Sequence, residues 1–172
     1  MRHADAFYFR QIAPEDAAEL LLFEATERDW FEQHIEARAE HFYTPEGISQ
    51  HIHEYLALNA QGRMRPLIIQ YQGAIVGRAN LREIENGYAK VGYRIAQHAC
   101  GNGLAQKALN HLISEARCID QINTLTATVS LDNHASQRVL TKAGFEVMEK
   151  LPEYSVVAGR KLDCVMMQKT DV

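Results

Sequence analysis

A short glycine-bearing stretch, Cys-Gly-Asn-Gly-Leu-Ala at residues 100–105, holds the residue types in this sequence that could bind an anion. Residues 89–95 before it alternate between apolar and polar, which is the period of a β-strand. Residues 104–116 after it repeat apolar side chains at the spacing of one helix face. The first turn of a helix has free backbone N–H groups, and glycine lets a phosphate come close to them. This order predicts a phosphate site, although an ordinary α/β joint has the same order and the spacing matches neither dinucleotide fingerprint.

Composition restricts the class of protein that can carry this stretch. The chain has 172 residues with 47% hydrophobic and 23% charged residues, which predicts one globular domain over 1–172. A net charge of −4 argues against a nucleic-acid partner. The three cysteines form no CxxC pair and the eight histidines form no ligand cluster, so we expect no metal site and a cytoplasmic location. We expect no membrane span and no signal peptide, because no apolar run is long enough.

The elements that must position the glycine stretch can be predicted along the chain. Asn86-Gly87 is a strong hairpin signal, and Thr44, Asn133 and Gly144 suit two helix N-caps and a helix C-terminus. The spacing of apolar residues predicts helices over 13–25, 28–40, 44–56, 103–116 and 133–143. They predict strands over 7–12, 66–71, 74–84, 89–95, 124–129, 145–148 and 162–167, with a connection over 151–161. The fold class is therefore α/β with a mixed sheet.

Four motifs in this order resemble the GCN5-related N-acetyltransferase (GNAT) superfamily. They are Val91-Gly-Tyr-Arg-Ile95, Gly101-Asn-Gly-Leu-Ala105, Asn133-x-x-Ser136 and Lys142-Ala-Gly-Phe145. Arg10–Asp16 resembles the opening of the family, and within it the chain is most similar to ribosomal-protein alanine/serine acetyltransferases of the RimJ/RimL type. The resemblance covers nearly the whole chain. It implies a GNAT fold with a mixed sheet of six or seven strands flanked by helices, and two splayed middle strands that hold CoA.

The resemblance implies acetyl-CoA as the cosubstrate, with no metal. It places the pyrophosphate on Cys100, Gly101, Asn102, Gly103, Leu104 and Ala105. Gly103 and Ala105 match the family loop, whereas Cys100 stands where relatives have Gln or Arg. Pantetheine is expected along Tyr93, Arg94, Ile95 and Ala96, with a solvated strand residue as the alternative for Arg94. Asn133 is expected either to contact the cofactor or only to cap its helix. A helix N-terminus can lower a thiol pKa, which we expect for Cys100.

The catalytic residues are harder to transfer from the family. Many relatives carry a donor tyrosine where this chain has Leu140, so Ser136 is the candidate donor, with a capping role as its alternative. Glu153 is the candidate general base. RimL-like proteins tend to have a glutamate where this chain has Lys90. The rival bases are Glu83, Glu85 and Tyr154.

The resemblance implies that an amine attacks the thioester directly. An α-amine with a pKa of about 8 is more often neutral near pH 7 than a lysine amine with a pKa of about 10.4. We therefore expect a protein N-terminal α-amine as acceptor, for example of a ribosomal protein. The alternatives are a small amine (a polyamine, amino acid or antibiotic) and a non-catalytic acyl-CoA-binding regulator. The sequence leaves oligomerisation open.

Overall fold

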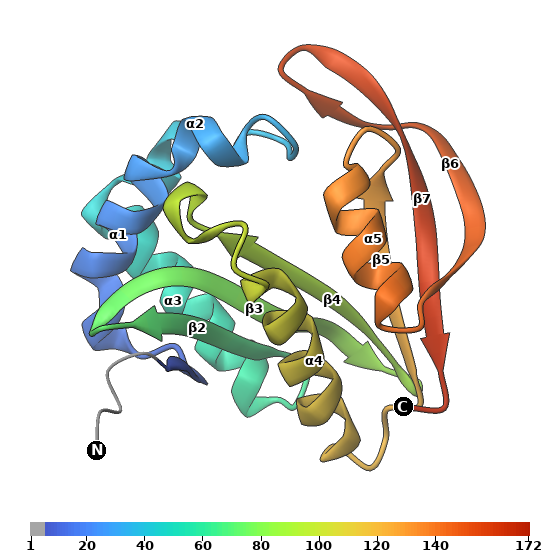
Figure 1. The fold of residues 1–172 in the computed structure, drawn as a ribbon. Helices are drawn as coiled ribbons and strands as arrows, with labels where there is room; N and C mark the ends of the chain where they lie inside the picture. Colours follow the sequence, from blue (N-terminus) through green and yellow to red (C-terminus); the bar gives the residue numbers. More distant parts are fainter. Residues whose placement is uncertain (1–5) are drawn as a thin grey trace.

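The computed structural model describes residues 6–172, which form one seven-stranded mixed sheet with helices on both faces (Figure 1). The strands are β1 (Phe7–Gln11), β2 (Arg65–Tyr71), β3 (Ala74–Glu85), β4 (Tyr88–Ile95), β5 (Thr124–Ser130), β6 (Glu146–Val157) and β7 (Arg160–Thr170). The helices are α1 (Ala17–Thr26), α2 (Arg28–Phe31), α3 (Pro45–Ala60), α4 (Leu104–Arg117) and α5 (His134–Lys142). The predicted α/β class with about six or seven strands is confirmed. Residues 1–5, on which the signal-peptide expectation partly depends, lie outside the described residues.

The sheet has the order β1-β2-β3-β4-β5-β7-β6, and its ladders are antiparallel except between β4 and β5. The predicted Asn86-Gly87 hairpin is confirmed, since both residues have positive φ, 52° and 84°. Gln72-Gly73 turns β2 into β3 in the same way, with φ of 49° and 83°. Helix α4 then supplies the predicted crossover from β4 to its parallel neighbour β5.

The parallel ladder in the middle of the sheet is very short. Tyr88, Ala89 and Lys90 pair with Thr124, Leu125 and Thr126, and the ladder ends there. Strand β4 continues to Ile95 and β5 to Ser130, so the two strands diverge from this junction (Figure 1). The predicted splaying of the middle strands is therefore confirmed.

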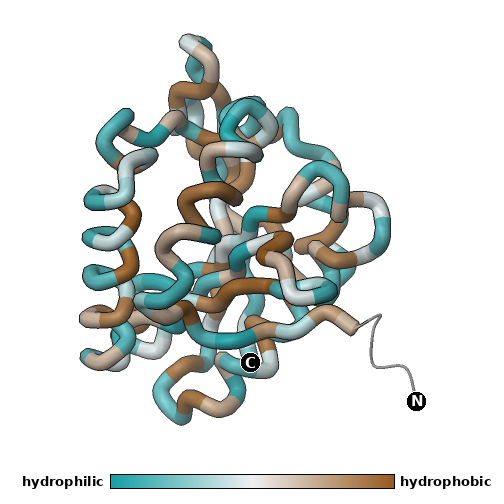
Figure 2. The backbone as a smooth tube through the Cα atoms, turned by 90° about the vertical axis from the view of Figure 1, so that its left-hand side faces the viewer, coloured by the Kyte–Doolittle hydropathy of each residue, from teal (hydrophilic) through white to brown (hydrophobic). Residues whose placement is uncertain are grey.

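The helices bury one apolar face each against the sheet. Helices α4 and α5 contact each other on one face, where α4 packs on β3 and β4, whereas α1 and α3 pack on β3 and β2 (Figure 1). Figure 2 shows hydrophilic residues on the outer turns of the peripheral helix at the left of that view and hydrophobic residues on its inner side. The inward residues of α4 are Leu104, Ala108, Leu109, Leu112, Ile113 and Ala116, all at most 7% exposed. Periodicity alone had predicted this face.

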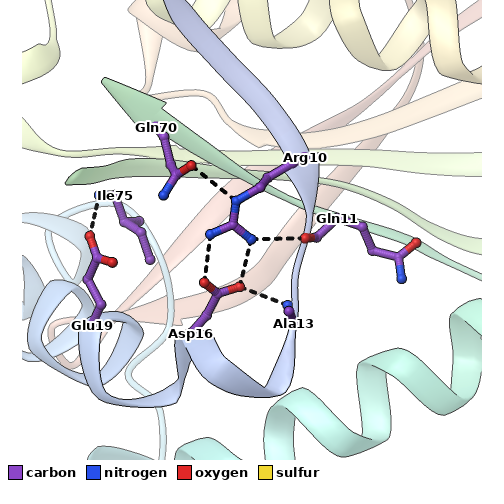
Figure 3. A network of polar contacts seen from close by, with 7 residues as sticks. All are labelled: Arg10, Gln11, Ala13, Asp16, Glu19, Gln70 and Ile75. Carbon is purple, nitrogen blue, oxygen red and sulfur yellow. Dashed lines mark hydrogen bonds and ion pairs between the residues drawn. The ribbon is translucent and has the colours of Figure 1, made fainter. Parts of the chain in front are cut away.

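A polar network fixes the start of α1 against the sheet (Figure 3). Arg10 donates to both carboxylate oxygens of Asp16, at 2.7 and 3.0 Å, and to Gln70 on β2 at 3.0 Å. Asp16 also accepts from the backbone N–H of Ala13, which satisfies a donor at the helix start. Burial would raise the pKa of Asp16, but these donors outweigh it and lower that pKa. The network holds α1 at the position from which it reaches β4.

The helix predicted over 28–40 is confirmed only for its first turn, Arg28–Phe31, and is wrong beyond it. The chain leaves helical geometry after Phe31, and a 3-10 turn follows at Glu40–Tyr43. Arg28 explains the reversal, because it donates to Glu32 at 2.9 Å and also to Glu40 at 2.6 Å. A straight helix would place residues 28 and 40 about 18 Å apart.

The connection predicted over 151–161 is also wrong, because β6 and β7 pair almost throughout it. The pairing closes at Val157 and Arg160 around a two-residue turn. Pro152 lacks an N–H and Glu153 has a φ of 48°, and the register shifts between Leu151 and Ser155. This bulge interrupts the alternation, which is why the sequence pattern did not read as one strand.

Candidate functional site

The loop before α4 forms an open cradle of backbone groups. Gly101 and Gly103 have φ of 84° and 72°, values that side chains rarely allow. Gly103 is the N-cap of α4, and no side chain among residues 6–172 caps that end. A Cβ on either glycine would meet no described atom within 4 Å. Leu104 is buried, so the cradle presents backbone N–H groups to an anion.

The outer edge of β4 faces the gap between the diverging strands. Ala96 donates its N–H to Val76 on β3. Because peptide groups alternate sides along a strand, those of Tyr93 and Ile95 point away from β3, toward the gap. Beyond Lys90 this edge has no strand partner within residues 6–172. The Ile95 carbonyl accepts from Trp30 Nε1 at 3.1 Å, so α2 closes the far end.

The phenol of Tyr93 and the hydroxyl of Ser136 meet across this gap. Their oxygens lie 3.1 Å apart, within hydrogen-bond distance. Tyr93 belongs to β4 and Ser136 to α5, so the pair joins the two halves of the sheet at the point where they separate. Burial raises the pKa of Tyr93, so the phenol stays protonated and can donate. The sequence predicted a role only for the backbone of Tyr93, and not for its phenol.

The start of α5 is held by a side-chain cap. Asn133 Oδ1 accepts from the Ser136 N–H at 3.1 Å, which confirms the predicted N-cap. Its predicted cofactor contact remains a prediction. The Ser136 hydroxyl is not used in the cap, because only its N–H takes part. Leu140 is 2% exposed and packs in the core.

The acidic candidates lie on the surface with basic partners. Glu153 Oε2 is 3.6 Å from Lys161 Nζ on the exposed hairpin. Glu83 pairs with Lys90 at 2.7 Å and Glu85 with Arg63 at 3.7 Å. These last two belong to the end of the β3–β4 hairpin at which β4 is paired with β5, and the gap opens at the other end. Glu153 therefore remains the candidate base, and the exposed Tyr154 beside it remains its rival.

Cys100 corrects one expectation. Burial, with a contribution from Glu27, raises the pKa of the Cys100 thiol rather than lowering it. Its Sγ donates toward the Ala96 carbonyl at 3.4 Å, so the thiol points back to the end of β4. The backbone cradle does not depend on this side chain.

Arg94 lies on the opposite face of β4 from Tyr93, because successive side chains alternate. Its guanidinium donates to Glu24 of α1 at 3.2 Å, and Arg78 of β3 donates to the other oxygen at 2.8 Å. Glu24 is 1% exposed and Arg78 is 2% exposed. The side chain of Arg94 thus belongs to a buried cluster, and its backbone N–H and C=O point to β3, so its predicted pantetheine contact remains a prediction. Glu24 was missed, although an acid beside Leu20 and Phe23 on an apolar helix stripe is unusual.

The geometry agrees with a comparison of sequences. Residues 7–146 match the acetyltransferase (GNAT) domain family. This chain belongs to the GNAT family. Probable N-acetyltransferase YjcK of Bacillus subtilis is 29% identical over 155 residues, which is 84% of this chain and 83% of that protein. L-methionine sulfoximine/L-methionine sulfone acetyltransferase of Salmonella typhimurium is 31% identical over 107 residues, 59% of this chain and 62% of that protein. The alignment with uncharacterized N-acetyltransferase p20 of Bacillus licheniformis covers 64% of p20.

Solved structures show the same fold. Ribosomal-protein-S5-alanine acetyltransferase of Vibrio fischeri superposes with a TM-score of 0.91 at 20% identity, covering 96% of this chain and 93% of that one. RimL, a ribosomal L7/L12 α-N-protein acetyltransferase in complex with coenzyme A, superposes with a TM-score of 0.88 at 18% identity, covering 95% and 93%. At such identities the likeness establishes the GNAT fold.

The chain is an acyltransferase of GNAT type, and acetyl-CoA is its cosubstrate. The open glycine cradle and the unpaired edge of β4 fit a phosphate and an extended amide-bearing arm, respectively. Within residues 6–172 no cluster of three His, Cys, Asp or Glu side chains could hold a metal ion. No helix in the same range has the length and apolar character to span a membrane.

Proposed function

We propose that this GNAT protein acetylates the α-amino group at a protein N-terminus, with a ribosomal protein as the first candidate. The observation that carries the proposal is the Tyr93–Ser136 pair beside the open edge of β4. A relay of two hydroxyls suits a reaction in which a weakly basic thiolate must be protonated while the amine needs little activation. The structural neighbours named as acting on ribosomal proteins support this acceptor class.

Acetyl-CoA supplies the thioester carbonyl. In the reaction a nitrogen–carbon bond forms, the carbon–sulfur bond breaks, the amine loses a proton and the sulfur gains one. Ser136 is the proposed proton donor to the sulfur, and the Tyr93 phenol passes a proton to Ser136. The proton that the amine loses is released to solvent, from which Tyr93 regains one at the end of the cycle. The backbone N–H groups of Tyr93 and Ile95 face the gap and can stabilise negative charge on a carbonyl oxygen. Cys100 to Ala105 position the pyrophosphate through the backbone.

Glu153 is the proposed acceptor of the amine proton. It lies on the β6–β7 hairpin, whose backbone also meets the loop after α2, since Val156 donates its N–H to Glu36 at 3.1 Å. The ion pair of Glu153 with Lys161 must break when Glu153 accepts a proton. Because an α-amine has a pKa of about 8, a weak surface carboxylate is sufficient for this step.

A small α-amino compound is the second candidate acceptor. The contact between Glu36 and Val156 joins the loop after α2 to the β6–β7 hairpin, and a short acceptor would need less space beside this contact than a protein chain. The similarity to an acetyltransferase named for L-methionine sulfoximine and L-methionine sulfone supports the same alternative. We place either activity in the cytoplasm, since the three cysteines are free thiols.

An acetyl-CoA turnover screen that measures released thiol tests the proposal. The acceptors are N-terminal peptides, free amino acids, polyamines and aminoglycosides. Turnover of peptides supports the first candidate, and turnover of amino acids alone supports the second. Tight CoA binding without turnover of any acceptor would establish the non-catalytic regulator instead.

A further inference from the structure

Three arginines gather around one carboxylate on the face of the sheet that α1 and α3 cover. Arg78 and Arg94 both donate to Glu24. Arg38 stacks on Phe42, and its positive charge contributes to lowering the pKa of Glu24. His51 accepts from Arg78 at 2.7 Å, and burial together with the adjacent Arg78 lowers the pKa of His51 to about 2. His51 is therefore neutral and adds no charge.

The cluster carries more positive charge than its own carboxylate balances. Arg78 and Arg94 against Glu24 leave one unbalanced positive charge, while Arg38 is half-buried at the rim. Burial lowers the pKa of Arg94 to about 10, as expected for a cation that is short of counter-charge. Buried cations are usually paired, so this arrangement is unusual for a purely structural role.

Three buried polar atoms in this region have no hydrogen-bond partner within residues 6–172. They are Nε of Arg38, Nε of Arg78 and Oδ1 of Asn80. Asn80 lies two residues from Arg78 on the same face of β3, and it pairs with Gly92 on β4. The unpaired set therefore contains donors that suit an anion and an acceptor that suits an N–H group. Orphaned buried groups of this kind point to a missing partner.

The arginine cluster and the Tyr93–Ser136 pair lie on opposite faces of β4. The glycine cradle opens at the start of α4, and Tyr93 and Ser136 meet on the α4–α5 face. CoA held by that cradle occupies this face and the gap. Arg94 directly follows Tyr93 but points to the other face, beside Phe31 at 5.3 Å. An amine that reaches the gap from the α1–α3 face, beside Phe31, therefore passes Arg94, whose side chain is 22% exposed.

We infer that Arg94, with Arg38 and Arg78, forms a subsite for a carboxylate of the acceptor, so that the substrate carries a carboxylate near its reactive amine. A carboxylate has the single charge that the buried part of the cluster lacks, and its two oxygens match the donor fork of a guanidinium. This inference rests on the proposed function, because it names the class of acceptor.

The carboxylate has two sources. It is either the α-carboxylate of a free amino acid or the side chain of an acidic residue next to a peptide N-terminus. Two pairs of acceptors distinguish them: a free amino acid against its amide, and a peptide with Glu at its second position against the same peptide with Gln. In one of the pairs, the acid is expected to have a kcat/KM roughly tenfold or more above that of the neutral partner.

Arg94→Gln tests the residue directly. It should remove the preference for the acid mainly through KM, while Arg94→Lys keeps part of it. Arg117→Gln, at the exposed C-terminal end of α4, makes the same charge change far from the cluster and should keep the full preference. If Arg94→Gln does not fold, the comparison of acid and amide on the wild-type protein still decides the question.

A binding experiment separates this inference from the proposed function. Calorimetry on the CoA-bound protein compares the N-acetylated acid with the N-acetylated amide, so no turnover is needed. Tighter binding of the acid by roughly tenfold supports the subsite even if the acyl transfer fails. Equal binding of acid and amide would overturn the inference. It would also be overturned if inorganic phosphate occupied the subsite more tightly than the N-acetylated acid does. Absence of turnover with every amine, together with acid-selective binding, would refute only the proposed function.

Discussion

Removing the Ser136 hydroxyl tests the proposed donor most directly. Ser136→Ala keeps the N–H that Asn133 caps, so α5 should remain intact. It leaves the Tyr93 phenol, which is mostly buried, without its 3.1 Å partner, at a cost of about 1–3 kcal/mol in stability. A thiol with a pKa of about 8.5 is a good leaving group, so we expect kcat to fall roughly 10–100-fold, which is at or below the low end of the effect of general acid catalysis. The KM for acetyl-CoA should change little, because the donor acts in the transition state.

The double-mutant cycle with Tyr93→Phe identifies a relay. If the two hydroxyls act as one unit, each single variant lowers kcat by a similar factor and the double variant is no slower than the worse single one. Stopped-flow or steady-state thiol release with saturating acceptor provides the kcat values. Thermal melts confirm that each variant is folded. If Ser136→Ala retains kcat within about twofold of wild type, catalysis depends on positioning alone and the donor assignment is wrong.

Four further outcomes are expected. Gly103→Val should weaken CoA binding in calorimetry, whereas Gly62→Val, with the same φ of 72° and equally open surroundings, should not. Bound CoA should protect Cys100 from alkylation, and labelling without CoA should be slow at neutral pH because the pKa of this thiol is raised; equal labelling in both states would argue against the cradle. Glu153→Gln should flatten the acidic limb of the kcat/KM profile, and an intact limb at wild-type rate would eliminate Glu153. Burial would raise the pKa of Glu24, but Arg78 and Arg94 hold it below its usual value, so Glu24 stabilises the fold at neutral pH and this contribution is lost as pH falls through that lowered pKa. Glu24→Gln should cost about 3–5 kcal/mol in denaturant unfolding at pH 7 and remove this acid sensitivity.

Local signals predicted the fold where they were strong. Asn86 and Gly87 both have positive φ and form the predicted hairpin turn. The apolar residues of α4 recur with the period of a helix, and these residues are the buried ones. The two failures have different causes. The segment after Phe31 keeps a helical pattern but is turned back by contacts of Arg28 with Glu40, which are twelve residues apart. The second half of β6 was predicted as a connection because a bulge at Pro152 breaks its alternation.

The site was predictable as far as it is made of backbone. The glycine cradle and the open edge of β4 follow from spacing and from the family resemblance. The side-chain partners were not predictable, because Tyr93 and Ser136 are 43 residues apart and meet only through the splayed sheet. Arg94 and Glu24 are 70 residues apart and depend on how α1 packs. Pairings of this kind are set by tertiary structure, and sequence periodicity carries no information about them.

The short ladder between β4 and β5 has a consequence for the protein before it meets its cosubstrate. Three residue pairs join the strands of the two halves, so the sheet has an exposed edge in its interior as well as at its margins. Open edges recruit other strands, and they are a route to aggregation. A cosubstrate lying along β4 would cover that edge and connect the two halves of the sheet. Its binding would raise the melting temperature of the protein once the cosubstrate concentration exceeds the dissociation constant. The cellular supply of CoA would then set how much of this protein survives as well as how fast it works.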